Sequence, residues 1–180
     1  DERSRKGIFL VMQSPLSIDG VSNSEFLKTA LTSKMGNSIG IYQFIQLMEK
    51  GMKELKMDSA MMHRSINKDF SGGEKKKNEI LQVKILKPSF IILDELDSGL
   101  DVDSLRIVCD NINDYLKENP NTSVLIITHY SRILDYIHPN YVHVMKNGKI
   151  VQTGSSSLAK QIEENGFECV NDVSGTTTHE

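Results

Sequence analysis

The amino-acid sequence predicts an α/β fold, in which helices pack on a core of parallel strands. Short apolar runs of strand length alternate along the chain with longer segments whose apolar residues recur at helical spacing, and this alternation is typical of a parallel sheet. The 180 residues are enough for a compact domain, and the 38% of hydrophobic and 25% of charged residues are ordinary values for a globular protein.

One strand and two helices are expected in the first third of the chain. Residues 8–12 are apolar and have the length of a short buried strand. Ser22 and Glu25 have the spacing of a capping box, in which two side chains satisfy free backbone amides at a helix start, so we expect a helix to about residue 32. Apolar residues at helical spacing predict a second helix over residues 42–57.

Strands and helices alternate through the rest of the chain. Ser71 and Glu74 form a second capping-box pattern, which predicts a helix that ends near residue 86. The further elements expected are a strand over residues 90–93, a helix over 101–116, a strand over 124–128, a short helix over 131–136, a hairpin of strands 141–145 and 149–153 around Asn147-Gly148, and a last helix over 157–165.

Two adjacent carboxylates end the apolar strand at residues 90–93. Because side chains alternate between the faces of a strand, Asp94 and Glu95 are expected to point in different directions and to suit different roles. A carboxylate such as Asp94 can hold Mg²⁺, which keeps waters and takes few protein ligands. Glu95 can then accept a proton from a water that attacks a phosphate.

The start of the helix behind Ser71 is a candidate anion site. Free backbone amides and the positive end of the helix dipole gather there, and Gly72 and Gly73 let the backbone approach a phosphate closely. The lysines at positions 75–77 follow in the same helix. One of them is a candidate ion-pair partner of Glu95, because this helix and the strand before Asp94 are sequential neighbours.

These motifs, in this order, resemble the ATPase domain of the ABC family. Gln13 closes the first strand, Ser71 lies 23 residues before Asp94, and His129 ends a later strand, 34 residues beyond Glu95. The order matches the Q-loop, signature, Walker B, D-loop and H-loop of that family. The resemblance implies a P-loop NTPase fold of the ABC type, with a parallel sheet core and a helical subdomain.

Each matching residue receives a role from this resemblance, with ATP and Mg²⁺ as the implied cofactors. Glu95 is the implied general base, His129 the implied contact of the γ-phosphate, and Gln13 the implied contact of the attacking water. Asp94 and Gln13 are implied to hold Mg²⁺. The implied ATP-binding residues belong to the signature and the D-loop: Ser71, Gly72, Gly73, Glu74, Ser98 and Asp101.

The resemblance also divides the chain into segments. Residues 1–15 correspond to a remnant of the ATPase core up to the Q-loop, and residues 16–70 to the helical subdomain. The rest of the ATPase core is expected over residues 71–170, followed by a disordered polar tail over residues 171–180.

The phosphate-binding loop of the family is missing from the sequence. No GxxxxGK[ST] pattern occurs, and in the family this loop precedes the Q-loop, which here lies almost at the first residue. We therefore expect a chain that has lost its N-terminal part and is inactive as an ATPase by itself, while the full-length protein is active.

Several segments point to one branch of the family. FSGGEKKKNEILQ, DELDSGLDVDSLRIV and THYSRILDYIHPNYVHV resemble the ATPase of the SUF system for iron–sulfur cluster assembly, and Asp94-Glu95 is followed by Leu96-Asp97 where transport ATPases commonly have Pro-Thr. This resemblance implies SufB-like and SufD-like scaffold partners and a transient, ATP-dependent homodimer. It implies no nucleic acid and no direct membrane insertion.

Composition agrees with that branch. The net charge is −3, no basic run exceeds residues 75–77, and no apolar run approaches the length of a membrane span. Cys109 and Cys169 fit no CxxC pattern and are expected to be free thiols. Lysine outnumbers arginine 16 to 5, which fits an AT-rich genome. We expect a soluble protein of a plastid-type organelle (apicoplast) or of a bacterial cytoplasm.

Three other function classes stay open at this point. The first is the ATPase subunit of a membrane ABC transporter, whose partners would be membrane proteins. The second is a chromosome-structuring or DNA-repair ATPase, but long coiled coils would separate its motifs, whereas Gln13 and Ser71 are 58 residues apart without sustained heptads. The third is a non-enzymatic chain that folds poorly and binds nothing.

Overall fold

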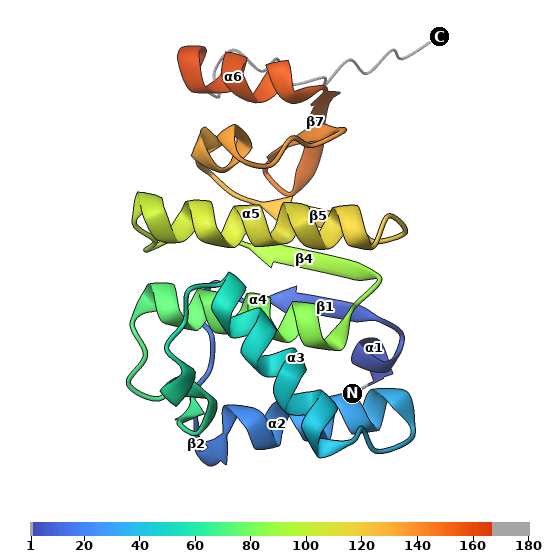
Figure 1. Cartoon of the computed structure of the whole chain (residues 1–180). Helices are drawn as coiled ribbons and strands as arrows, with labels where there is room; N and C mark the ends of the chain where they lie inside the picture. Colours follow the sequence, from blue (N-terminus) through green and yellow to red (C-terminus); the bar gives the residue numbers. More distant parts are fainter. Residues whose placement is uncertain (1, 167–180) are drawn as a thin grey trace, which may run out of the picture. The chain divides into compact units, whose positions relative to one another are not determined.

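The computed structural model describes residues 2–166, which form two compact units that divide between His129 and Tyr130 (Figure 1). The predicted disordered tail over residues 171–180 and the predicted free thiol of Cys169 lie outside the described residues. The division of the chain at residues 15, 70 and 170 stays a prediction. Among the described residues, no helix combines the length and the apolar composition that crossing a membrane would need.

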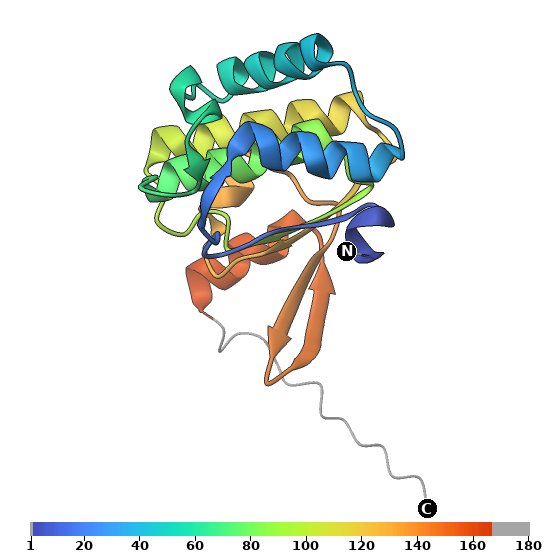
Figure 2. The same cartoon turned by 90° about the horizontal axis from the view of Figure 1, so that it is seen from below.

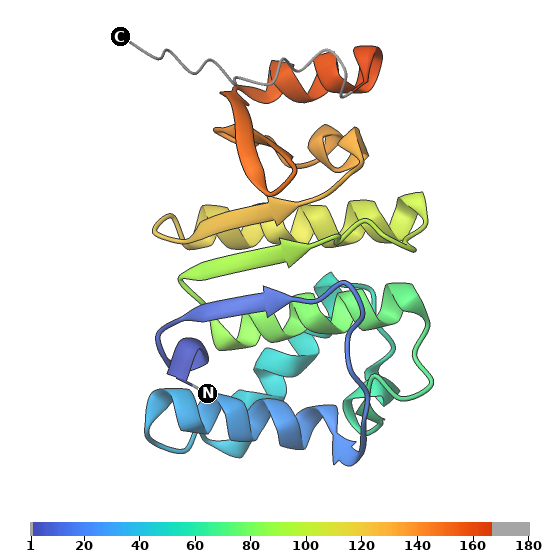
Figure 3. The same cartoon turned by 180° about the vertical axis from the view of Figure 1, so that it is seen from behind.

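A three-stranded parallel sheet is the centre of the first unit. Its strands are β1 (Ile8–Val11), β4 (Phe90–Asp94) and β5 (Ser123–Ile127), in the order β1-β4-β5. Figure 3 shows the three strands side by side and running in one direction. All three were expected, within a residue of their observed ends.

Helices cover one face of this sheet, as the view in Figure 2 shows. Val11, Ile91 and Leu93 point into this layer and are almost fully buried. The helices on this side are α2 (Asn23–Met35), α3 (Ile41–Glu54), the 3-10 helix η1 (Ser59–Met62), α4 (Gly72–Leu86) and α5 (Val102–Glu118), whereas the short α1 (Glu2–Arg5) precedes β1 and has no buried residue. The predicted α/β fold with a parallel sheet core is therefore confirmed.

The other face of the sheet carries an exposed apolar row. The register places Leu10 opposite Ile92, and Ile92 opposite Leu125. Leu10 is 47% exposed, Leu125 44% and Ile127 47%. Parallel sheets are normally covered on both faces, so this row is surface that a further layer would be expected to cover.

Both predicted capping boxes are present. Ser22 Oγ accepts a hydrogen bond from the backbone N–H of Glu25 at 3.3 Å, and the Glu25 carboxylate accepts one from the backbone N–H of Ser22 at 3.0 Å. At the start of α4, the Glu74 carboxylate accepts from the backbone N–H of Ser71 at 2.7 Å, and Ser71 Oγ accepts from the N–H of Glu74 at 3.2 Å. Local sequence therefore sets the first residue of both helices.

A small antiparallel ribbon and a short first helix were not expected. β2 (Ile18–Ser22) pairs with β3 (Ser65–Ile66), and α1 lies ahead of β1, where no helix was predicted. The ribbon depends on Asn67, whose amide donates to the Leu16 carbonyl at 2.8 Å and whose own carbonyl accepts from Ser17 Oγ at 2.9 Å. These partners lie about 50 positions apart, beyond the reach of local patterns.

A hairpin and two helices make up the described part of the second unit. They are η2 (Ser131–Asp135), β6 (Val142–Lys146), β7 (Lys149–Gly154) and α6 (Ser156–Asn165). Asn147 and Gly148 join β6 to β7 with φ of 50° and 75°, as a two-residue hairpin turn requires. Val144 and Leu158 form a small core between the hairpin and α6.

Candidate functional site

The predicted site residues lie at the edge of the sheet where the strands end. Figures 1 and 3 agree that α4 and α5 both begin on this side of the first unit. In parallel α/β sheets, the carboxyl ends of the strands are the usual place for ligand sites. The fold thus brings Gln13, Ser71, Asp94, Asp101 and His129 to one edge.

Glu95 is the centre of a three-residue cluster at this edge. Its carboxylate accepts a hydrogen bond from Gln13 Nε2 at 2.5 Å and lies 3.5 Å from His129 Nδ1. Its backbone has a φ of 44°, a left-handed conformation that few non-glycine residues adopt, and its N–H donates to the Ile127 carbonyl at 2.9 Å. Such strain often marks a functional position, and here it turns Glu95 toward Gln13 and His129.

Asp94 ends β4 and is half-buried. The alternation of the strand gives it the same face as Phe90 and Ile92, and the register places it opposite Ile127 of β5. Within residues 2–166, no three His, Cys, Asp or Glu side chains could hold a metal ion by themselves. One carboxylate and the amide oxygen of Gln13 nevertheless fit Mg²⁺, because that ion takes few protein ligands beside water and phosphate oxygens.

The signature residues lie against the D-loop. A Cβ added at Gly72 would lie 3.6 Å from the Gly99 carbonyl oxygen, and one added at Gly73 would lie 3.2 Å from Ser104 Oγ. Asp101 caps α5, because its carboxylate accepts from the backbone N–H and the hydroxyl of Ser104 at 2.7 and 2.9 Å. These two hydrogen bonds from Ser104 lower the pKa of Asp101.

Ser98 and Glu74 are held mainly by backbone and capping interactions. The N–H of Ser98 donates to the Glu95 carbonyl at 3.0 Å, so the D-loop begins directly from the cluster around Glu95. The carboxylate of Glu74 is engaged in the capping box with Ser71. The structure therefore groups the predicted residues into two neighbouring sets, one around Glu95 and one around Gly72 and Gly73.

Sequence reasoning missed Glu79, Asp97 and Thr128 beside the cluster, and it named Lys76 only as one of three candidate partners of Glu95. Lys76, Glu79 and Asp97 are buried, with exposed fractions of 2%, 3% and 1%, and Thr128 Oγ1 donates to the Asp97 carboxylate at 3.1 Å. The helical period gave a signal, because positions 76 and 79 lie one turn before the buried Ile80 and Val83.

Lys76 is the lysine of the 75–77 run that turns inward. Its ammonium donates to the backbone carbonyl of Met12 at 2.5 Å. Burial lowers the pKa of Lys76, and the nearby charges of Glu79, Asp94, Asp97 and Glu95 oppose that shift. Lys76 therefore interacts with Glu95 through charge, whereas its hydrogen bond goes to the Met12 carbonyl.

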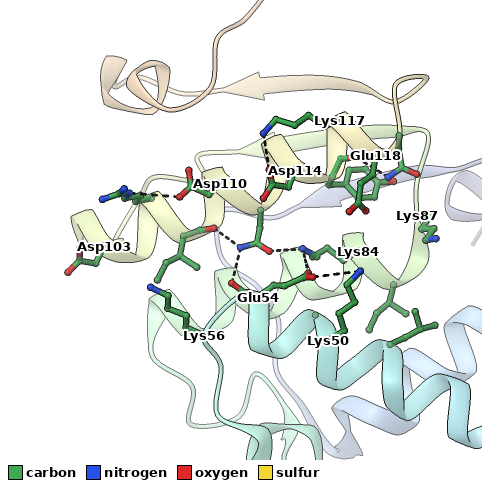
Figure 4. Close-up of a pocket in the computed structure, with 18 residues that line it drawn as sticks. Lys50, Glu54, Lys56, Lys84, Lys87, Asp103, Asp110, Asp114, Lys117 and Glu118 are labelled. Carbon is green, nitrogen blue, oxygen red and sulfur yellow. Dashed lines mark hydrogen bonds and ion pairs between the residues drawn. The ribbon is translucent and has the colours of Figure 1, made fainter.

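A large groove lies elsewhere, between α3, α4 and α5 (Figure 4). Lys84 crosses its floor, with its ammonium 2.5 Å from the Glu54 carboxylate and 2.6 Å from Asn111 Oδ1. None of the predicted site residues lines this groove. The polar side chains of Lys84, Glu54 and Asn111 bind one another on the groove floor. The groove is therefore separate from the predicted site.

Comparisons with known proteins fit this geometry. No family model matches the chain. The chain is 46% identical over 172 residues to the "Probable ATP-dependent transporter ycf16" of Trieres chinensis and 46% identical over 171 residues to the "Probable ATP-dependent transporter SufC" of Escherichia coli. In both cases the match covers 93% of this chain and 68% of the relative. The chain belongs to the ABC ATPase family.

Further matches agree with this family assignment. A relative from Synechocystis sp., "Probable ATP-dependent transporter slr0075", is 48% identical over 171 residues, covering 93% of this chain and 66% of that protein. The ABC ATPase chain thus spans about two thirds of the length of these relatives.

Solved structures show the same fold. The dimeric structure of MJ0796, a bacterial ABC transporter cassette, superposes with a TM-score of 0.73 at 17% identity, covering 86% of this chain and 65% of that chain. A post-hydrolysis state of MJ0796 bound to ADP and Pi gives a TM-score of 0.72 at 16% identity, covering 84% of this chain and 64% of that chain. The predicted ABC-type fold is therefore confirmed.

Proposed function

We propose that the full-length protein is the ATP-hydrolysing subunit of a SufBCD-like complex for iron–sulfur cluster assembly. The observation that carries the ATPase part is the cluster in which Glu95 contacts both Gln13 and His129. The 46% identity to a protein named SufC supports the SUF assignment. The name "ABC transporter ATP-binding protein" of another relative, 44% identical, keeps a transporter subunit as the alternative.

Glu95 is the proposed general base for the hydrolysis of ATP. Its carboxylate would accept a proton from the attacking water, while Gln13, already hydrogen-bonded to that carboxylate, would orient the water. His129, on the other side of the carboxylate, would contact the γ-phosphate. Asp94 and Gln13 would hold Mg²⁺, which neutralises charge on the phosphates when it is bound.

The signature is proposed to bind ATP held by a second copy of the chain. Ser71 and Gly72 are exposed at the start of α4, where free amides and the helix dipole favour phosphate. Glu74, Ser98 and Asp101 would support this contact from the capping box and the D-loop. ATP would thus join two protomers transiently, and their movement would remodel the scaffold partners.

The ATPase proposal is tested by comparing this chain with the full-length protein. We propose that the full-length protein has a GxxxxGK[ST] loop in addition to these 180 residues, in which the pattern does not occur. Phosphate release with Mg·ATP should therefore be measurable for the full-length protein and absent for residues 1–180. Robust hydrolysis by residues 1–180 would contradict the proposal.

SufB-like and SufD-like proteins are the proposed partners, and their contact is expected over residues 13–60. This segment exposes several large apolar side chains, with Leu16 69%, Ile41 65% and Tyr42 71% exposed. Such surface is typical of interaction sites when it is contiguous. Leu16→Glu and Tyr42→Glu should therefore reduce co-purification with a SufB- or SufD-like protein in the absence of detergent.

Tyr141→Glu is the matched control, because Tyr141 is 72% exposed but lies outside the proposed contact. It should leave co-purification unchanged. Recovery of membrane permeases alone would favour the transporter alternative. Localisation in a plastid-type organelle or a bacterial cytoplasm stays part of the proposal.

A further inference from the structure

Two charged side chains of α4 hold the backbone of Met12 from both ends. Met12 lies one residue beyond the last pair of the β1–β4 register, Val11 with Leu93. Its N–H donates to Glu79 Oε1 at 2.9 Å, and its carbonyl accepts from Lys76 Nζ at 2.5 Å. Figures 1 and 3 show α4 running alongside β1, which makes this contact possible.

This arrangement places two ionisable groups in the interior. Lys76 is 2% exposed and Glu79 3%, and within the described residues Glu79 Oε2 is buried without a hydrogen-bond partner. Burial also raises the pKa of Glu79 to about 7, against the opposing effects of the Met12 N–H and the Lys76 charge. Burying charged groups costs free energy, so neutral side chains would hold the N–H and the carbonyl of one residue at lower cost if the contact were purely structural.

The position of Met12 connects the two sets of site residues. Gln13, the next residue, donates its amide to Glu95. Lys76 and Glu79 belong to the same continuous helix as Gly72 and Gly73, and they lie about one and two turns beyond these glycines. A displacement of the signature at the start of α4 would therefore be carried by a rigid helix to the peptide group that precedes Gln13.

We propose that Glu79, together with Lys76, is a positioning residue that couples the signature helix to Gln13 by holding the backbone of Met12. This inference rests on the proposed ATPase function, since it assigns Gln13 a part in hydrolysis. Glu79 acts through Met12 and Gln13 and needs no contact with the reacting atoms.

Glu79→Leu in the full-length protein tests the coupling. Leucine fills the space but cannot accept the Met12 N–H, so Gln13 should lose its position beside Glu95. Because small displacements of positioning groups are costly, kcat should fall about 10–100-fold with little change in the KM for ATP. Glu79→Gln should recover most of the turnover, because its amide oxygen can accept the same N–H. Lys76 is a poorer target, since its charge also acts on Glu95.

A double-mutant cycle with Gln13→Ala separates coupling from general damage. If Glu79 works through Gln13, Glu79→Leu should lower kcat much less in the Gln13→Ala background than in the wild type. Equal losses in both backgrounds would overturn the proposal. So would unchanged turnover in Glu79→Leu, or a Glu79→Gln variant as slow as Glu79→Leu.

Lys84→Met is the matched control on the same helix. It removes the partly buried ion pair with Glu54, which lies in the groove between α3, α4 and α5. Lys84→Met should leave kcat unchanged. Thermal unfolding curves, measured for every variant, show whether that variant is folded. Glu95→Gln distinguishes the two proposals. If its turnover stays near the wild-type rate, the proposed ATPase site is wrong. If Glu95→Gln loses turnover but Glu79→Leu does not, only the proposed coupling is wrong.

Discussion

Glu95→Gln in the full-length protein should bind ATP normally and hydrolyse it about 10²–10⁴-fold more slowly, the usual cost of losing a general base. The amide has the shape of the carboxylate and can still hydrogen-bond a water, but it cannot take the proton that the water gives up. Gln13 and His129 should keep their contacts with residue 95, because glutamine has the same size and shape as glutamate. Phosphate release and the binding of a fluorescent ATP analogue measure the two quantities separately.

Glu118→Gln is a suitable comparison for this experiment. Glu118 ends α5 and lies in the groove between α3, α4 and α5, away from the predicted site residues. The same chemical change there should leave turnover as it is. Turnover near the wild-type rate in Glu95→Gln would remove Glu95 from the role of general base.

The second large effect is expected on assembly. In the Glu95→Gln background, where hydrolysis is blocked, ATP should drive dimerisation of the full-length protein, and Gly72→Asp should abolish it. Gly72 is exposed, and an added Cβ would only reach ordinary contact distance from the Gly99 carbonyl, 3.6 Å. The monomer should therefore fold and bind ATP, while the new carboxylate repels the phosphates held by the other protomer.

Gly73 is the less suitable position for this test. A Cβ there would lie 3.2 Å from Ser104 Oγ, which bonds to Asp101, so a large side chain would disturb the D-loop as well. Ser157→Asp adds the same charge at the exposed start of α6 and should leave dimerisation intact. Sedimentation with and without ATP gives the answer. A Gly72→Asp variant that dimerises like its parent would mean that the signature does not bind phosphate across the interface.

Local patterns predicted most of the elements but few of the contacts between them. Capping boxes at Ser22 and Ser71, and apolar runs at β4 and β5, act over a few residues, so they are legible in the sequence. The hydrogen bond between Gln13 and Glu95 joins residues 82 positions apart. Only the family resemblance placed that pair in one site.

The hold on Met12 was missed for a related reason. One lysine of positions 75–77 was predicted to pair with Glu95, but Glu79 was not singled out and no burial was predicted, because charged residues are seldom fully buried. Burial of Lys76 and Glu79 depends on the end of β1, which lies 64 and 67 positions earlier in the chain. The same limit applies to the ribbon of β2 and β3, which a network centred on Asn67 and Asn78 holds to α4.

The apolar row on the open face of the sheet affects how these 180 residues would behave in a test tube. Leu10, Leu125 and Ile127 present nearly half of their surface to water, and within residues 2–166 the outer strands β1 and β5 of the same sheet each pair with β4 alone. Apolar surface beside unpaired strand edges favours self-association. We therefore expect residues 1–180, produced by themselves, to self-associate and to form inclusion bodies or soluble aggregates.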